Sequence, residues 1–137
     1  MAKKQEWPKL PKRFKNKWLK ALRGGEYKQA TGALVELDEF SEDGTLLDEP
    51  KVRGFCCLGV ACMIQGADVK AIKDSTLIYE EVATQIEGIP APIIGNVEEN
   101  ALVAKLIAMN DGKHKDDGSV TKRKSFKQIA TWIEENL

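Results

Sequence analysis

The segment at residues 55–62, with the sequence FCCLGVAC, constrains the fold more than any other part of this chain. It contains no charged side chain and continues into two further apolar residues, so it is too apolar for an element on a protein surface. We therefore expect a buried helix over residues 56–65, ended by Gly66, in which Gly59 lets another segment approach closely. A fully buried strand is the alternative, because periodicity does not separate the two in so short a run.

The length of 137 residues is typical of one domain, and such a domain buries roughly 68% of the surface of its unfolded chain. We expect a single domain over residues 1–137, in which residues 1–11 form a flexible or loosely docked basic arm. No apolar run approaches the roughly 20 residues of a membrane span, and no apolar stretch follows the basic start. The sequence therefore predicts a cytoplasmic protein with no membrane partner.

All three cysteines lie inside the FCCLGVAC segment, and two of them are adjacent, which is not the spacing of a disulfide framework. The one histidine, His114, lies far along the chain among charged residues, so a zinc site would lack ligands. For the same reason a cysteine nucleophile activated by histidine is a weak hypothesis. We expect no metal, no cofactor, no catalytic residue and no enzymatic activity.

The first and last helices have clear sequence signals. Residues 12–23 carry apolar side chains on one face, and Gly24 begins a glycine pair that suits a helix end. Ser125 stands three residues before Gln128, which is the spacing of a capping box at a helix start. The apolar stripes of these two helices consist of Phe14, Trp18 and Leu22 in the first, and of Phe126, Ile129, Trp132 and Ile133 in the last.

Two more helices and a hairpin complete the predicted fold. Apolar spacing predicts helices over residues 79–87 and 98–109, the second with glutamates at the positive end of its dipole. Strands over residues 31–40 and 52–55 would form a β-hairpin with a long acidic loop between them. The predicted class is α+β, a mainly helical small domain with about four to five helices and one β-hairpin made of two short strands.

The net charge of zero hides an uneven distribution. Residues 1–28 hold ten Lys or Arg against two Glu (+8), residues 29–112 hold five basic against fifteen acidic residues (−10), and the remainder carries +2. We favour docking of the basic start on its own domain, and an anionic partner such as nucleic acid is the alternative. The cations that would contact nucleic acid are Lys12, Arg13, Lys17, Lys20 and Arg23.

The first candidate binding site lies where a strand meets the buried helix, at residues 53–57. No Ser, Thr, Asp or Asn precedes the helix, so its free N–H groups together with Arg53 would bind an anion. A cysteine at that position would also have a lowered pKa. The alternative, which we favour, is that Cys56 and Cys57 are small buried hydrophobic side chains.

Two polar segments are further candidates. The loop at residues 26–32 offers an aromatic ring and hydrogen-bonding groups, although a simple connector is the favoured interpretation. Asn110 and Asp111 would line a site or, as we favour, end a helix. The predicted ligand-binding residues are Tyr27, Lys28, Gln29, Arg53, Cys56, Cys57, Asn110 and Asp111.

Several of these stretches resemble small uncharacterised accessory proteins of tailed bacteriophages and prophages. The resemblance is carried by WLKALRGGEYKQ at residues 18–29, by FCCLGVAC, by LIAMND at residues 106–111 and by SFKQIATWIEEN at residues 125–136. It implies a phage source and the cytoplasm of an infected bacterial host. Accessory phage proteins of this size often act by binding, some of them on host nucleotide signals and others on host proteins or nucleic-acid enzymes.

These observations lead to one expectation and one alternative. We expect a phage counter-defence protein that binds and sequesters a small anionic, nucleotide-like host signalling molecule without catalysis. The alternative is an inhibitor that binds a host protein or nucleic acid through the basic helix. Both hypotheses allow a homo-oligomer.

Overall fold

The FCCLGVAC segment forms the centre of the protein in the computed structural model, which describes residues 6–114 and 120–137. Helix α2 (Cys57–Ile64) is buried throughout residues 57–62, which confirms the predicted buried helix over the alternative strand. A Cβ atom at Gly59 would lie only 1.8 Å from the carbonyl oxygen of Leu34. The predicted close approach at this glycine is therefore confirmed.

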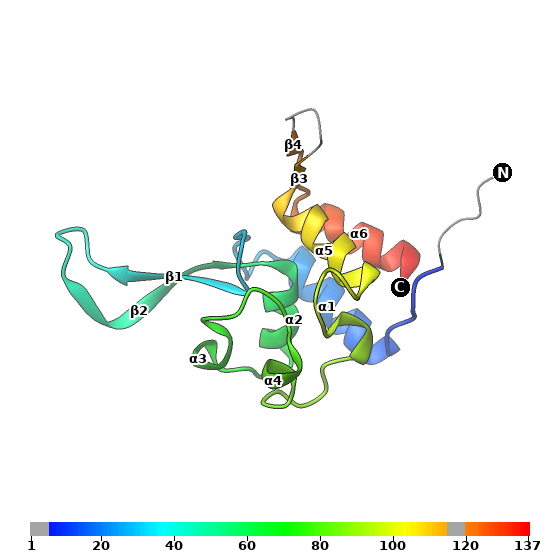
Figure 1. Cartoon of the computed structure of the whole chain (residues 1–137), viewed down its shortest axis with the longest axis horizontal. Helices are drawn as coiled ribbons and strands as arrows, with labels where there is room; N and C mark the ends of the chain where they lie inside the picture. The colour runs from blue at the N-terminus through cyan, green and yellow to red at the C-terminus, as the bar shows by residue number, and fades with distance from the viewer. Residues whose placement is uncertain (1–5, 115–119) are drawn as a thin grey trace.

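Three longer helices lie together beside α2 (Figure 1): α1 (Lys12–Gly24) and α5 (Ala101–Asp111), which both contact it, and α6 (Phe126–Asn136), which packs on α1 and α5. Helix α1 packs against both α2 and α6, and the indole Nε1 of Trp18 donates to the carbonyl oxygen of Cys57 at 3.0 Å. Helix α6 begins with the predicted capping box between Ser125 and Gln128. The core is thus helical, and the apolar stripes of α1 and α6 face it.

The hairpin consists of β1 (Val35–Phe40) and the antiparallel β2 (Leu46–Phe55), which project from the helical body as an arm (Figure 1). The hairpin prediction is confirmed, but the long acidic loop is wrong. The connection spans only residues 41–45, because Ser41 N bonds to Thr45 O at 2.8 Å and Gly44 adopts a positive φ of 85°. Most of the expected loop therefore belongs to β2.

Shorter elements differ from the sequence prediction. Helix α3 (Val69–Ile72) was not expected, and α4 (Glu80–Ala83) covers only part of residues 79–87. A 3₁₀ turn, η1 (Ala91–Ile93), lies in the following connector. Helix α5 begins at Ala101 rather than at residue 98, because the Asn100 side chain caps the N–H groups of Leu102 and Val103.

The fold is α+β and mainly helical, as predicted, with six α-helices among the described residues rather than four or five. Strands β3 (Lys113–His114) and β4 (Val120–Thr121), which the sequence did not predict, pair with each other, and residues 115–119 between them lie outside the described residues. Residues 1–5 of the predicted basic arm also lie outside them, whereas Leu10 is buried. Among the described helices, none has the length and apolar character needed to cross a membrane.

Candidate functional site

The structure brings three predicted site segments together at the centre of the fold. Phe55 N donates to Lys28 O, and Ala30 N donates to Phe55 O, both at 2.8 Å, so residues 28–30 run along the end of β2. Gly54 makes this possible, because a Cβ there would lie 2.9 Å from Lys28 O. Asn110, at the end of α5, bonds to residues 28–30 and to the start of α2.

Asn110 is fully buried and connects these segments through four hydrogen bonds. Its Oδ1 accepts from the backbone N–H of Cys57 and from Nε2 of Gln29, each at 3.1 Å. Its Nδ2 donates to Ala30 O at 2.8 Å and to Oδ1 of Asp111 at 2.7 Å. We call these five residues the Asn110 cluster.

Both polar side-chain atoms of Asn110, Nε2 of Gln29 and both carboxylate oxygens of Asp111 have partners within the protein. Gln29 Nε2 also donates to Lys124 O at 2.8 Å, and Asp111 Oδ2 accepts from Gly32 N at 3.3 Å. Buried side chains with satisfied hydrogen bonds hold segments together and offer few groups to a ligand. We therefore assign a structural role to the predicted site residues Gln29, Asn110 and Asp111.

The prediction of an uncapped α2 start is wrong. Cys56 is the N-cap, and its Sγ accepts from Gly59 N at 3.4 Å, while Asn110 accepts from Cys57 N. Cys56 N itself donates to Leu34 O at 3.3 Å. The N–H groups of Cys57 and Gly59 thus have partners within the fold, which removes the uncapped helix start on which the predicted anion site depended.

The three thiols are buried and free. Burial raises the pKa of Cys56 to about 11 and that of Cys62 to about 12, and it raises the pKa of Cys57 as well. The lowered cysteine pKa considered for the helix start is therefore wrong, because loss of water outweighs the favourable backbone dipoles.

Arg53 does not join the Asn110 cluster. Its side chain is 63% exposed, and its Nη1 lies 3.8 Å from Oε1 of Glu36 across the hairpin. Lys28 contributes its backbone carbonyl to the contact with Phe55, while its side chain is exposed. The predicted anion site required the Arg53 side chain and the start of α2 to act together. The structure places these two groups apart in the fold.

Tyr27, the remaining predicted residue, lines an open hollow between α1 and the end of α2. The hollow has a volume of about 450 Å³. The Tyr27 ring stands edge-on to the Phe55 ring, with the two centroids 5.4 Å apart and the two planes at 82°. We call this hollow the Tyr27 groove, and its lining residues are Lys17, Lys20, Ala21, Gly24, Glu26, Tyr27, Met63 and Ile64.

Two lysines make the Tyr27 groove cationic. Lys17 Nζ donates to Oε1 of Gln65 at 2.8 Å, and Gln65 Nε2 in turn donates to Gly88 O at 2.8 Å. Lys17 is thereby oriented before any ligand arrives, and Lys20 follows one helical turn later. Glu26 is the acidic group on the lining, so the groove carries two positive charges and one negative.

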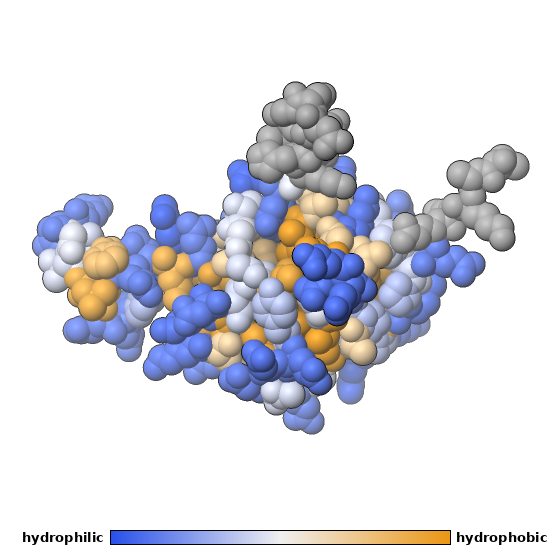
Figure 2. All heavy atoms as spheres, in the orientation of Figure 1, coloured by the Kyte–Doolittle hydropathy of each residue, from blue (hydrophilic) through white to orange (hydrophobic). Residues whose placement is uncertain are grey.

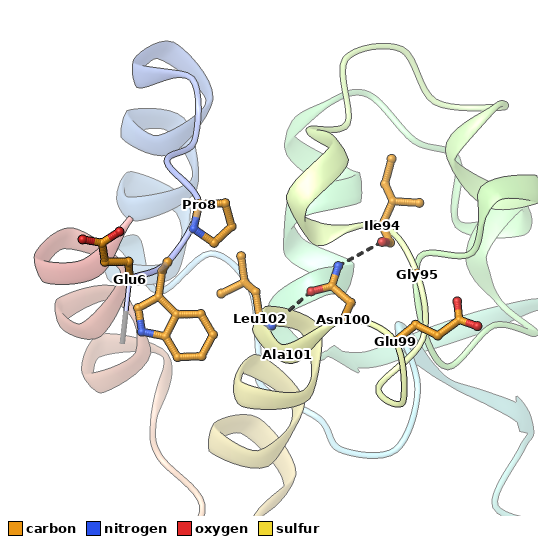
Figure 3. A pocket seen from close by; sticks show the side chains of 9 residues that line it. Glu6, Pro8, Ile94, Gly95, Glu99, Asn100, Ala101 and Leu102 are labelled. Carbon is orange, nitrogen blue, oxygen red and sulfur yellow. Dashed lines mark hydrogen bonds between the residues drawn. The ribbon is translucent and has the colours of Figure 1, made fainter. Parts of the chain in front are cut away.

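A second hollow, of about 380 Å³, lies at the start of α5 and is lined partly by the N-terminal segment (Figure 3). Asn100 donates here to Ile94 O at 3.1 Å and accepts from Leu102 N at 3.0 Å, which fixes the loop before the helix. Its charged lining residues are Glu6 and Glu99, which repel anions. Charge thus favours the Tyr27 groove for an anionic ligand.

The sequence interpretation did not combine Tyr27 with the lysines of α1. Lys17, Lys20 and Gly24 follow one another at helical spacing, so they share a face that leads to Tyr27. That spacing was a usable signal. Met63 and Ile64 gave no such signal, because their place depends on how α2 packs against α1.

The fold and the groove together define a small α+β protein with an open cationic hollow. Comparison with known protein families, with curated proteins and with solved structures gave no match for this chain. Within residues 6–114 and 120–137, no three His, Cys, Asp or Glu side chains are placed to hold a metal ion.

Proposed function

We propose that this protein binds a small anionic, nucleotide-like molecule in the Tyr27 groove and retains it without chemical conversion. The observation that carries the proposal is the meeting of two lysines and one aromatic ring around a single hollow of about 450 Å³. Lysine ammonium groups bind phosphate, and aromatic rings stack on nucleobases. Met63 and Ile64 add an apolar surface for the same ligand.

The chemistry of the groove supports binding rather than thiol catalysis. None of the three cysteines lines the groove, and burial raises their pKa values, so little thiolate is present at neutral pH. The groove residues suit recognition, through charge from Lys17 and Lys20 and through contact area from Tyr27. Sequestration of a host signalling nucleotide in the cytoplasm of a phage-infected bacterium is the role that we propose on the resemblance described above.

Isothermal titration calorimetry of the purified chain against cyclic dinucleotides and ADP-ribose derivatives tests the proposal. We expect the Lys17→Ala, Lys20→Ala double variant to weaken binding at least about tenfold, because each lysine contacts a phosphate. The matched control is Lys70→Ala, Lys73→Ala, which removes two exposed lysines at the same spacing away from the groove. This control is expected to bind as the wild type does.

The aromatic contribution has its own control, since the chain has two tyrosines. Tyr27→Leu is expected to weaken nucleotide binding about tenfold, whereas Tyr79→Leu, at a residue 40% exposed outside the groove, leaves it unchanged. Absence of binding across the panel contradicts the proposal. Equal binding by the wild type and the groove variants also contradicts it.

A second candidate is an acidic macromolecular partner bound by α1. Lys12, Arg13 and Lys20 are exposed, and within the described part of the chain none of them forms an ion pair. Lys15 and Arg23 instead contact Glu134 of α6, which supports docking of part of the basic helix on its own domain. This candidate predicts DNA or protein binding that falls steeply with salt and is lost in Lys12→Ala, Arg13→Ala.

A further inference from the structure

Most of the β1–β2 hairpin projects from the helical body (Figure 1). We call residues 35–55 the acidic arm, since they hold seven Asp or Glu against Lys51 and Arg53, a net charge of −5. Along the acidic arm only Val35, Gly54 and Phe55 are buried, all at the end that joins the body. Figure 1 shows the rest projecting away from the helices. A two-stranded hairpin without a covered face is marginally stable on its own.

Large apolar side chains are exposed on the acidic arm. Phe40 is 54% exposed, its cross-strand partner Leu46 is 67% exposed, and Val52 is 45% exposed. Figure 2 shows apolar atoms near the free end of the arm, surrounded by hydrophilic ones. Such grouped apolar exposure marks interaction sites, whereas single exposed residues are ordinary.

The acidic arm also carries a hollow of about 490 Å³. Phe40 and Leu47 provide its apolar lining, and carboxylates from Asp38, Glu42 and Asp43 surround them. Lys51 also lines the hollow, so its charged side chains sum to −2. The hollow therefore combines apolar contact area with net negative charge. A side chain that ends in a cation and has an aliphatic stem fits both features.

Hydrogen bonds within residues 41–45 hold the turn at the tip of the acidic arm. Asp43 accepts hydrogen bonds from the Ser41 hydroxyl and from Thr45 N, and these bonds lower its pKa to about 2. Gly44 N donates to Ser41 O at 2.9 Å in the same turn. A charged and preorganised tip reduces the entropy that binding must overcome.

We propose that the acidic arm docks a partner protein that presents a basic segment with interspersed apolar side chains. Charge complementarity selects this partner. Two arms of −5 repel each other, which disfavours arm-to-arm pairing of two copies. Helix α1 of a second copy is basic, but its apolar residues are buried in its own core, so it offers Phe40 nothing to contact. The proposal is independent of the Tyr27 groove.

Fluorescence anisotropy with labelled ten-residue peptides tests this docking. The probes are an alternating Lys-Leu peptide, an alternating Lys-Ser peptide and an alternating Glu-Leu peptide. We expect the Lys-Leu peptide to bind at least about tenfold more tightly than either of the others, since only it offers both positive charge and apolar area. Asp38→Asn, Glu42→Gln should reduce the salt dependence of that binding.

The variant that removes the apolar contacts is Phe40→Ser, Leu46→Ser, and its control is Val97→Ser, a residue 43% exposed outside the arm. The double variant should lose at least about tenfold in affinity for the Lys-Leu peptide, and the control should lose none. In the wild type, binding of the Lys-Leu peptide should slow hydrogen exchange within residues 35–55. Equal binding by the double variant, no binding by the wild type, or protection elsewhere overturns the proposal. A wild-type dimer in sedimentation that becomes monomeric in the double variant also overturns it and assigns the arm to a second copy.

Discussion

Asn110→Ala should destabilise the protein more than any exposed substitution, because the Asn110 cluster depends on one side chain. The truncation leaves Cys57 N and Ala30 O buried without their partner, while Gln29 keeps its bond to Lys124 O. A buried polar group without a partner costs about 1–3 kcal/mol, so the two together predict a loss of about 4 kcal/mol in the free energy of unfolding. Urea denaturation followed by circular dichroism measures this loss.

Two further variants make the test specific. Asn110→Asp keeps the size of the side chain but places an oxygen where Nδ2 donates to Ala30 O, so it should be at least as destabilising as alanine. Asn96→Ala removes one exposed hydrogen bond, to Glu99 N, and should cost about 1 kcal/mol or less. If Asn110→Ala costs no more than Asn96→Ala, the structural role of the cluster is refuted.

Three other changes follow from the packing and the caps. Gly59→Ala should lower the free energy of unfolding by about 3 kcal/mol in calorimetric melting, since the new Cβ would meet Leu34 O. Gly24→Ala should leave stability unchanged, because nothing lies within 4 Å of a Cβ at that position. Equal effects of the two substitutions would contradict the close approach at Gly59. Cys56 should react with iodoacetamide only after denaturant is added, and rapid labelling of the native protein would rule this out. The free energy of unfolding should fall as pH rises from 9.0 to about 11, because the thiol ionises in the unfolded chain before it ionises in the folded protein. Ser125→Ala should cost about 1 kcal/mol in urea, and no change would argue against the capping box.

The sequence predicted those features that depend on neighbouring residues. Burial of the FCCLGVAC segment follows from its composition, and the capping box at Ser125 follows from a spacing of three residues. The helix at residues 79–87 was too long in the prediction, because apolar spacing does not show where tertiary contacts end a short helix.

Features that join distant segments were not predictable in the same way. Asn110 bonds to Ala30, 80 residues earlier in the chain, so its asparagine looked like an ordinary helix end. The cap of α2 was missed because a cysteine sulfur is not among the side chains preferred at helix starts. The Tyr27 groove required the packing of α1 on α2, although the spacing of its lysines was visible in the sequence.

The methyl resonance of Met63 provides the most direct test of the proposed ligand site. Met63 lines the Tyr27 groove, whereas Met109 is 4% exposed in the core and serves as an internal reference. In the protein labelled with ¹³C at the methionine methyl groups, titration with cyclic dinucleotides and ADP-ribose derivatives should shift the Met63 resonance in a saturable manner and leave that of Met109 in place. No saturable shift at Met63 with any of these ligands, or an equal shift at Met63 and Met109, would contradict binding in the groove.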